Sequence, residues 1–367
     1  MAGTDKTVLF ISPLPPPDGG VQSWTAGILE NGLPGGYVPA VVDTRLRGAR
    51  RNWALKRLSF SELNRTVAIL GELFVKLIAR RPRIVHLNCC LSPLGVYRDL
   101  ACAVIARLFG KPLVTHYHAD FAVFPAGSHH GLSRWCLRRL ANISQLNIAL
   151  NDESCAGLNA LLARGKPPAF VLPNFIDDRC RGHEAEPGAC KARCQVIYVG
   201  RISVAKGCRE ILELAARLPD ADFVLIGVVL EDMETAVRSK PANVRLVGAL
   251  PRADVLAALS RSEIFLFPSH TEGFPVAVLE AMAVGLPVVA TRVGAIPQMI
   301  EEGRGGFLAG RQAVDELYWG LKALTDDPQR RSAMGGFNRD LARRRYDYTA
   351  VTGQLARHYD RLLAGDA

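Results

Sequence analysis

The 367-residue chain lacks a long apolar run, a zinc-like spacing of cysteine and histidine, and any low-complexity stretch. A membrane-spanning helix needs roughly 20 consecutive apolar residues, and no run approaches that length. The first residues are polar, and the short apolar run from Val8 to Ile11 predicts a strand rather than a signal peptide. These absences favour a soluble globular protein.

The nine cysteines are scattered and form no Cys-x2-Cys pair. Cys190 and Cys194 lie four residues apart, which alone is a weak signal for a metal clip. Free thiols in a reducing cytoplasm are the simplest explanation of this pattern. We therefore expect a cytoplasmic protein without a metal ion or other cofactor.

Acidic residues are in deficit, but only in one half of the chain. The formal net charge is +10; residues 1–180 hold 21 Lys and Arg against 12 Asp and Glu, and residues 181–367 hold 24 against 23. A basic half indicates an anionic partner such as a membrane surface, a phosphorylated acceptor or nucleic acid.

Short apolar runs alternate with helical patterns along the whole chain, which predicts α/β domains with parallel sheets. The length suggests two domains. The polar stretch from Ile176 to Arg193 interrupts the alternation and is typical of a linker. We predict a first domain at 1–178, a linker at 179–194, a second domain at 195–347 and a terminal helix at 348–367. The expected strands are Val8–Ile11, Val38–Val42, Ile84–Leu87, Leu113–His116, Asn147–Leu150, Ala169–Leu172, Gln195–Gly200, Asp222–Ile226, Val244–Val247, Ile264–Phe267, Pro287–Ala290 and Gly306–Leu308.

The segment from Arg45 to Phe60 alternates cations with apolar residues, among them Trp53, Leu55 and Leu58. Such a segment could lie on an anionic membrane, with its aromatic ring at the interface. A solvated basic loop and helix explains it equally well. A nucleic-acid partner is not expected, because no nucleic-acid-binding module is recognisable.

Two glutamates bracket the start of an expected helix between two strands in the second half. Glu272 lies in the loop after the strand Ile264–Phe267, and Glu280 lies on the helix that leads to the strand Pro287–Ala290. Free N–H groups at a helix start favour anionic oxygens, and carboxylates accept hydrogen bonds from sugar hydroxyls. The spacing alone is not specific, since a loop glutamate and an exposed helix glutamate are common.

A glycine-bounded loop with two cations follows the first strand of the second half. It runs from Gly200 to Gly207 and carries Arg201 and Lys206. Arginine offers a bidentate fork and lysine a point charge, so a diphosphate is the natural ligand.

Three features of the first half are weaker signals. Gly19-Gly20 follow the first strand, where paired glycines let the backbone approach a phosphate or sugar closely, although a tight turn also explains them. His118 and Asp120 follow the strand ending at His116. A lone histidine is most often structural.

The flanks of the glutamate pair carry a resemblance. Gly-Phe-Pro directly after Glu272, the run Glu-Ala-Met-Ala-Val-Gly-Leu-Pro-Val-Val-Ala from Glu280, and Gly294 resemble the retaining, nucleotide-sugar-dependent glycosyltransferases of GT-B fold. That fold consists of two doubly wound, Rossmann-like domains facing across a cleft. The similarity spans nearly the whole chain and is strongest in residues 196–310. In this family the terminal helix crosses back onto the first domain.

The resemblance implies that residues of both domains contact the transferred sugar. Glu272, with the backbone around Gly273, Phe274 and Pro275, would orient the sugar, and Pro275 itself has no N–H to offer. His118 would contact the sugar from the first domain. Glu272 would be a positioning group rather than a nucleophile, because the family's acceptor attacks on the face from which the nucleotide leaves.

The nucleotide is assigned in the same way. Arg201 and Lys206 match the family's diphosphate-binding cations, and Glu280 matches its ribose-binding glutamate. Gly19 and Gly20 match a loop that touches donor and acceptor. Cations that stabilise the leaving diphosphate make a metal ion unnecessary.

Other positions match less closely. Ala249 and Leu250 fall where the family contacts the base, largely through backbone. Asp120 and Asn174 would support the site without taking part in the reaction. Three residues depart from the family's usual pattern: Ala119, Phe175 and Gln298.

We therefore expect a retaining, metal-independent hexosyltransferase that moves a sugar from a UDP-, GDP- or ADP-sugar to a glycan or lipid-linked acceptor. Cell-envelope polysaccharide or glycolipid synthesis is the expected setting, in the cytoplasm or peripherally on the inner face of the membrane. The alternatives are a sugar-nucleotide epimerase or a glycoside phosphorylase of the same fold, and a non-catalytic nucleotide-sugar-binding protein. The epimerases lack the Glu272-Gly-Phe-Pro arrangement, and an intact set of charged residues argues against a mere binder.

Overall fold

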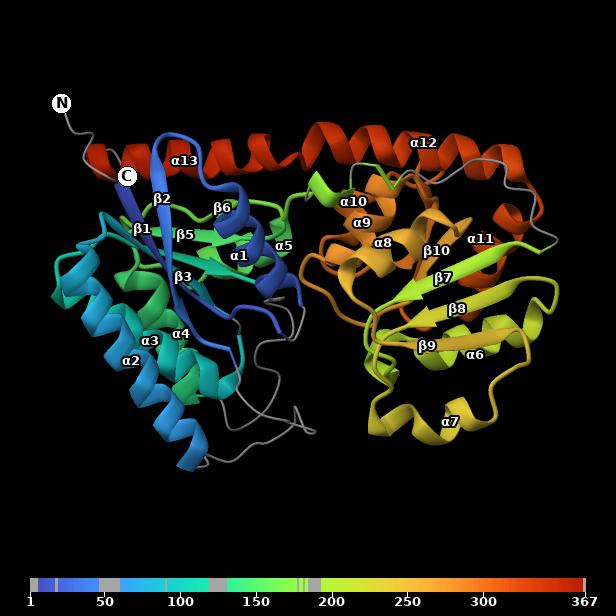
Figure 1. Ribbon diagram of the computed structural model, residues 1–367, viewed down its shortest axis with the longest axis horizontal. Coiled ribbons are helices and arrows are strands. Elements are labelled where there is room, and N and C mark those ends of the chain that lie inside the picture. The colour runs from blue at the N-terminus through green and yellow to red at the C-terminus, as the bar shows by residue number, and fades with distance from the viewer. Residues whose placement is uncertain are drawn as a thin grey trace. The chain divides into compact units, whose positions relative to one another are not determined.

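A computed structural model describes residues 6–16, 19–45, 60–89, 91–118, 131–176, 178–180, 182–183 and 193–365 (Figure 1). The chain divides into two compact units. Unit 1 comprises Met1–Asn174 and Thr349–Ala367, and unit 2 comprises Phe175–Tyr348. Most of the basic segment 45–60 and of the expected linker lies outside the described residues, as does Asp120.

Unit 1 contains a six-stranded parallel sheet in the order β2-β1-β3-β4-β5-β6. Its central strands are buried along their whole length, as expected where helices cover both faces of a parallel sheet. The strands are β1 (Lys6–Ser12), β2 (Tyr37–Asp43), β3 (Ile84–Cys89), β4 (Leu113–Tyr117), β5 (Leu146–Ala149) and β6 (Phe170–Val171). The helices are α1 (Gly20–Asn31), α2 (Phe60–Arg80), α3 (Pro93–Leu108), α4 (Gly131–Ile143), α5 (Asp152–Asn159) and α13 (Tyr348–Ala364).

The terminal helix α13 packs within unit 1. The Tyr359 hydroxyl lies 2.6 Å from Nδ1 of His86 on β3. Tyr37 of β2 donates to Asp360 at 2.8 Å. His358 stacks on Phe170 of β6, with ring centroids 3.7 Å apart. The last helix of the chain therefore packs against strands β2, β3 and β6 of the N-terminal part of the chain.

Unit 2 contains a second six-stranded parallel sheet, in the order β12-β11-β10-β7-β8-β9. The strands are β7 (Gln195–Val199), β8 (Asp222–Ile226), β9 (Val244–Gly248), β10 (Ile264–Phe267), β11 (Val288–Thr291) and β12 (Gly306–Ala309). The α-helices are α6 (Cys208–Arg217), α7 (Glu234–Arg238), α8 (Arg252–Ser260), α9 (Val276–Val284), α10 (Ile296–Met299), α11 (Val314–Thr325) and α12 (Pro328–Arg345), and the 3-10 turns are η1 (Asp178–Cys180), η2 (Val204–Lys206) and η3 (Glu231–Met233).

The predicted α/β class with two parallel sheets is confirmed, and each expected strand coincides with an observed one. The strand order reverses beside the first strand of each unit, between β1 and β3 in unit 1 and between β7 and β10 in unit 2. Ligands of doubly wound sheets bind at the carboxyl ends of the strands at such a switch point. The loops after these strands are therefore the expected ligand-binding positions.

Within the described residues, no helix combines the length and the apolar character that a membrane span requires.

Candidate functional site

The loop after β7 is built on glycine. Gly207 has a φ of +71° and ends η2, and a Cβ at this position would overlap the carbonyl oxygen of Pro268 after β10. The Tyr198 hydroxyl donates to the Arg201 carbonyl at 2.8 Å, which fixes the backbone that carries the Arg201 side chain. Glycine at 207 thus lets the two switch-point loops of unit 2 touch directly.

An ion pair joins these two loops. Lys206 Nζ lies 2.5 Å from Glu272 Oε1, and the two side chains keep only 18% and 11% of their surface exposed. The backbone N–H of His270 also donates to the Ala205 carbonyl at 3.0 Å. The structure therefore brings Lys206 and Glu272 together at the switch point, although 66 residues separate them in the sequence.

The Glu272 loop is held from its far side by the loop after β11. Gly294 has a φ of +53°, and a Cβ there would overlap the Glu272 carbonyl oxygen. Ala295 N–H donates to the Gly273 carbonyl at 2.9 Å. Phe274 is buried edge-to-face against Tyr346, with ring centroids 5.5 Å apart. The glutamate therefore sits on a braced loop.

Helix α9 begins directly after this loop. Pro275 is its N-cap, no side chain caps the first turn, and no acidic residue lies in that turn. The N-terminal N–H groups and the helix dipole give this corner a positive potential. The start of α9 directly follows the Glu272 loop, so both the helix N-terminus and Lys206 contribute positive potential near Glu272.

Glu280 lies on α9, buried, with Oε1 2.9 Å from a guanidinium nitrogen of Arg252. Arg252 is the first residue of α8, directly after the stretch Ala249–Pro251. Ala249 is exposed and Leu250 is half-buried, and both lie in the loop after β9. The Arg252–Glu280 pair thus links the predicted base-contacting loop to the predicted ribose-binding glutamate.

Sequence reasoning missed Arg252 and a second pair, His270 with Glu210. His270 Nε2 lies 2.8 Å from Glu210 Oε1 on α6. The available signals were an arginine directly after Pro251 at a helix start, and a histidine within the motif itself. Neither identifies its partner, because each pair joins distant parts of the chain.

At the switch point of unit 1, neutral side chains around His118 form a hydrogen-bonded network, and the Arg45–Asp43 ion pair also contacts the loop after β1. His118 follows β4, and its Nε2 lies 3.0 Å from Asn88 Oδ1 on β3. Asn88 Nδ2 donates to Ser12 Oγ at 2.9 Å and to Thr25 Oγ1 at 3.2 Å. Trp24 of α1 meets the His118 ring edge-on, with centroids 5.5 Å apart. The sequence predicted His118 but neither Asn88 nor Trp24.

Three histidines cluster in this part of unit 1. The His116 and His118 rings lie 4.0 Å apart and the His86 and His116 rings 5.7 Å apart, measured between centroids. Burial, and then the neighbouring His118, lower the pKa of His86 to about 3; burial lowers that of His118 to about 3. The pKa of His116 is lowered well below its ordinary value for the same reason. All three rings are therefore neutral at pH 7.

The remaining predicted residues of unit 1 are placed as follows. Gly19 is the N-cap of α1 in extended backbone, and Gly20 is the first residue of the helix. Both precede Thr25, which belongs to the Asn88 network. Asn174 is buried at the last position of this part of unit 1.

Potential metal ligands do not gather at this site. The chain contains one Asp-x-Asp pattern, Asp220-Ala221-Asp222. It lies at the amino end of β8, the edge of the sheet opposite the switch-point loops, and Asp222 is 3.3 Å from Arg193. Within the described ranges, no three His, Cys, Asp or Glu side chains are placed to hold a metal ion.

Comparison with known proteins assigns this chain to a family. Residues 184–340 match the family model of glycosyl transferases group 1. The chain is 30% identical over 291 residues to 2-deoxystreptamine glucosyltransferase of Streptomyces kanamyceticus, covering 72% of this chain and 74% of that protein. This chain belongs to the group 1 glycosyltransferases.

Other relatives and structures agree on the family and the fold. Sulfoquinovosyl transferase SQD2 of Arabidopsis thaliana is 31% identical over 308 residues, 78% of this chain but only 58% of that protein. Sucrose-phosphate synthase of Thermosynechococcus elongatus superposes with a TM-score of 0.77 at 16% identity, covering 98% of this chain and all of that one. Anabaena HepE in complex with UDP and glucose gives a TM-score of 0.72 at 19% identity, covering 97% and 99%.

Proposed function

We propose that this glycosyltransferase moves a hexose from a nucleoside diphosphate sugar to a hydroxyl acceptor, with retention of anomeric configuration and without a metal ion. The acceptor we propose is a glycan or a lipid-linked glycan of the cell envelope. The observation that carries the proposal is the Lys206–Glu272 pair at 2.5 Å, which joins the loops after β7 and β10.

In this proposal the diphosphate lies against Arg201, Lys206 and the start of α9. An ammonium has three donors, so Lys206 can keep Glu272 and still donate to a phosphate oxygen. Negative charge grows on the diphosphate as the bond to the sugar breaks, and fixed cations stabilise that charge most in the transition state. This removes the need for a metal ion at the leaving group.

The two glutamates have separate tasks. Glu280, held by Arg252 at 2.9 Å, accepts hydrogen bonds from the ribose hydroxyls. Glu272, fixed by Lys206 and by the close approach of Gly294, accepts from hydroxyls of the transferred sugar. Oriented in this way, the sugar presents its anomeric carbon to the acceptor at little entropic cost.

The reaction then requires no protein nucleophile. The bond between the anomeric carbon and the phosphate oxygen breaks, a bond to the acceptor oxygen forms on the same face, and the acceptor proton passes to the leaving phosphate. His118, neutral at pH 7 because burial lowers its pKa to about 3, contacts the sugar and does not act as an acid. The neighbouring structures of HepE with UDP-glucose and of starch synthase IV with ADP support a nucleotide donor for this chain.

The test begins with a thermal-shift panel of UDP-, GDP- and ADP-sugars on the wild-type protein. A ligand at 100 times its Kd stabilises the folded state by about 2.7 kcal/mol, which gives a clear rise in Tm. The nucleotide sugar that binds is then incubated with candidate acceptors, and the anomeric configuration of the product is read by NMR. An inverted product contradicts the retaining mechanism, and an epimerised donor without transfer favours the epimerase alternative.

A further inference from the structure

The outward face of α2 is mainly apolar, with Asn64 as an exposed polar side chain within it. Its five large exposed side chains keep about half or more of their surface in solvent: Leu63 54%, Val67 61%, Phe74 49%, Val75 62% and Ile78 53%. At 100° per residue these side chains fall within an arc of about 120°. A helix that is apolar on its solvent side marks an interaction surface.

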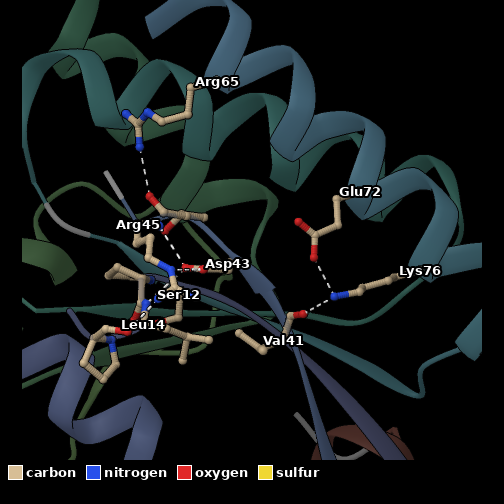
Figure 2. Close-up of polar contacts among 11 residues, drawn as sticks. Ser12, Leu14, Val41, Asp43, Arg45, Arg65, Glu72 and Lys76 are labelled. Atoms are coloured by element: carbon tan, nitrogen blue, oxygen red, sulfur yellow. Dashed lines mark hydrogen bonds and ion pairs between the residues drawn. The ribbon is translucent and has the colours of Figure 1, made fainter. Parts of the chain in front are cut away.

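Four of the five charged residues of the same helix form ion pairs, and the fifth, Arg80, is exposed in its last turn. Arg65 lies 2.6 Å from Glu62. Lys76 lies 2.5 Å from Glu72 and donates to the Val41 carbonyl of β2 (Figure 2). Both acidic groups of α2 are thus neutralised beside the sheet. None of the five charged residues of α2 falls within the arc of its exposed apolar side chains.

Cations and further apolar side chains continue this surface on the adjoining helices. On α3, Leu108 is 79% exposed, and Phe109 beyond it meets Phe74 of α2 edge-to-face at 5.4 Å. On α4, which packs against α3, Leu132 and Trp135 are 61% and 50% exposed. The exposed cations of these helices and of the turn after α2 are Arg80, Arg81, Arg107, Arg134, Arg138 and Arg139.

Negative charge does not compensate them within the described part of this layer. Asp99 of α3 is buried, with Oδ1 2.6 Å from Arg98. Glu62 and Glu72 are paired as above. The surface therefore combines apolar side chains with uncompensated positive charge.

We propose that this α2–α4 face of unit 1 docks on an anionic phospholipid surface. Apolar side chains enter the interfacial region of a bilayer while arginines bind lipid phosphates, each worth about 1 kcal/mol near the surface. A second copy of the chain fits less well, because a self-complementary contact would bring the same cations together. The docking would place unit 1 beside lipid-borne acceptors without any membrane-spanning helix.

Vesicle co-sedimentation of the full chain tests this proposal. The probes are phosphatidylcholine vesicles with and without 30% phosphatidylglycerol, about 100 nm across. Wild type should bind the anionic vesicles at least about tenfold more tightly than the neutral ones. The variant V67S/V75S/I78S, whose changes lie at exposed positions, should lose about tenfold or more of that binding.

A matched pair of charge variants separates local from general electrostatics. R134Q/R138Q removes two exposed cations of α4, and R238Q/R245Q removes two exposed cations of unit 2. Both lower the net charge by the same amount, but only the first should weaken vesicle binding, by about tenfold. Equal effects of the two variants, or equal binding of the serine variant and wild type, would overturn the proposal. So would a wild-type dimer in sedimentation velocity that the serine variant dissociates.

A second inference follows from the hydrogen bonds around His118. Thr25 Oγ1 donates to the Val21 carbonyl at 2.9 Å, and its other neighbour Ser12 Oγ lies at 2.5 Å and so donates to it. Both hydroxyl oxygens therefore offer lone pairs to Asn88 Nδ2. The amide oxygen of Asn88 is left to accept from His118 Nε2–H at 3.0 Å.

We infer that Asn88 is a positioning residue that holds His118 in its Nε2–H tautomer. His118 Nδ1 is then an acceptor for a sugar hydroxyl, a step that rests on the function proposed above. The chain of donors runs one way from β3 through β1 to α1, since each hydroxyl has one hydrogen to give. A side chain without an acceptor at 88 would release the ring to the other tautomer.

Nitrogen-15 NMR of histidine-labelled protein reads the tautomer directly. The His118 signals are those that disappear in His118→Gln, and they should report Nε2–H at pH 7. Asn88→Leu should mix in the Nδ1–H tautomer and lower kcat/KM for the donor about tenfold, whereas Asn142→Ala, an amide lost elsewhere in unit 1, should change neither. An Nδ1–H signal in wild type, or an unchanged signal in Asn88→Leu, would overturn the inference. A changed tautomer with unchanged donor kinetics supports the positioning and contradicts only the sugar contact.

Discussion

In unit 2, charged side chains pair across the switch-point loops and between neighbouring helices, whereas the side chains of the network around His118 in unit 1 are neutral and linked to buried rings. Lys206–Glu272 and Arg252–Glu280 represent the first kind. His118–Asn88, beside Trp24, represents the second. The same topological position thus carries two chemistries in one chain.

The difference indicates a division of labour. A leaving diphosphate requires fixed positive charge, and loops that hold ion pairs at partly exposed positions provide it without losing solvation entirely. A sugar contact requires orientation rather than charge, and a histidine kept neutral by burial provides an acceptor that does not titrate near pH 7.

The largest effect is expected at Glu272. Glu272→Ala removes the carboxylate that positions the sugar, so transfer should fall about 1,000-fold or more while the protein stays folded. The measurement is initial-rate transfer together with circular dichroism. Glu302→Ala, which removes an exposed carboxylate paired with Arg292, is the control and should leave transfer unchanged. Transfer by Glu272→Ala within tenfold of wild type would refute the assignment.

The histidines of unit 1 should make the protein sensitive to acid. Their pKa values are lowered in the folded state, to about 3 for His86, so protonation favours the unfolded chain. The histidines do not lower the free energy of unfolding above pH 6.5, where they are neutral in both states. Below pH 6.5 the unfolded chain takes up protons, so the free energy of unfolding falls progressively until the pH approaches 3. At pH 4.5, about two units below the ordinary histidine pKa, His86 alone should lower the free energy of unfolding by about 2.7 kcal/mol, at about 1.36 kcal/mol per unit.

Proton uptake on unfolding measures this effect. Calorimetry at pH 5.5 in buffers of different ionisation enthalpy should show net proton uptake on unfolding: about three protons enter His86, His116 and His118, partly offset by release from Asp99, whose pKa burial raises in the folded state. Uptake below one proton would mean that these rings are already charged in the folded protein. The neutral character ascribed to unit 1 would then be wrong.

A smaller effect is expected at Arg201. Arg201→Ala should weaken nucleoside diphosphate binding by about 2 kcal/mol, near the low end for a lost charge contact, because the side chain is exposed. Equilibrium dialysis with labelled nucleotide measures the change of about 30-fold. Arg245→Ala, an exposed arginine on β9, serves as the control. Equal affinity of Arg201→Ala and wild type would remove Arg201 from the diphosphate site.

The smallest expected effect is on stability, at Gly294. Gly294→Ala and Gly303→Ala place a Cβ on backbone with φ of +53° and +77°, which should cost each variant about 1 kcal/mol of folding stability, and the steric overlap at 294 should add to the loss in that variant. Only the Cβ at 294 overlaps the Glu272 carbonyl, whereas the space around 303 is open. Transfer should therefore fall in Gly294→Ala alone, as measured by kcat/KM beside urea unfolding. Equal kinetics in the two variants would show that the Gly294 contact does not position Glu272.

The sequence predicted the fold well because the fold depends on local patterns. Apolar strands alternating with helical stretches predict parallel sheets, and those strands are buried as expected. The unit 2 loops were also predictable, since Arg201 and Lys206 lie within one glycine-bounded stretch and Glu272 and Glu280 within another. Residues that lie this close together in the sequence can be recognised without knowing the fold.

The partners across loops were not predictable. Arg252 reaches Glu280 from another helix, and Asn88 reaches His118 from a neighbouring strand. The separation of two residues in the sequence does not indicate whether they are close in space, because the order of the strands in the sheet decides which loops and helices are neighbours. The apolar face of α2 shows the same limit, since helical periodicity does not say which of two faces is outward.

The central claim is that the switch point of unit 2 binds a nucleoside diphosphate. Isothermal titration calorimetry of UDP, GDP and ADP against wild type and Lys206→Ala/Glu280→Ala tests it most directly. The account predicts one-to-one binding of at least one of these nucleotides to wild type, weakened by at least about 100-fold in the double variant. Binding of equal affinity to both proteins, or no binding of any of the three to wild type, would contradict it.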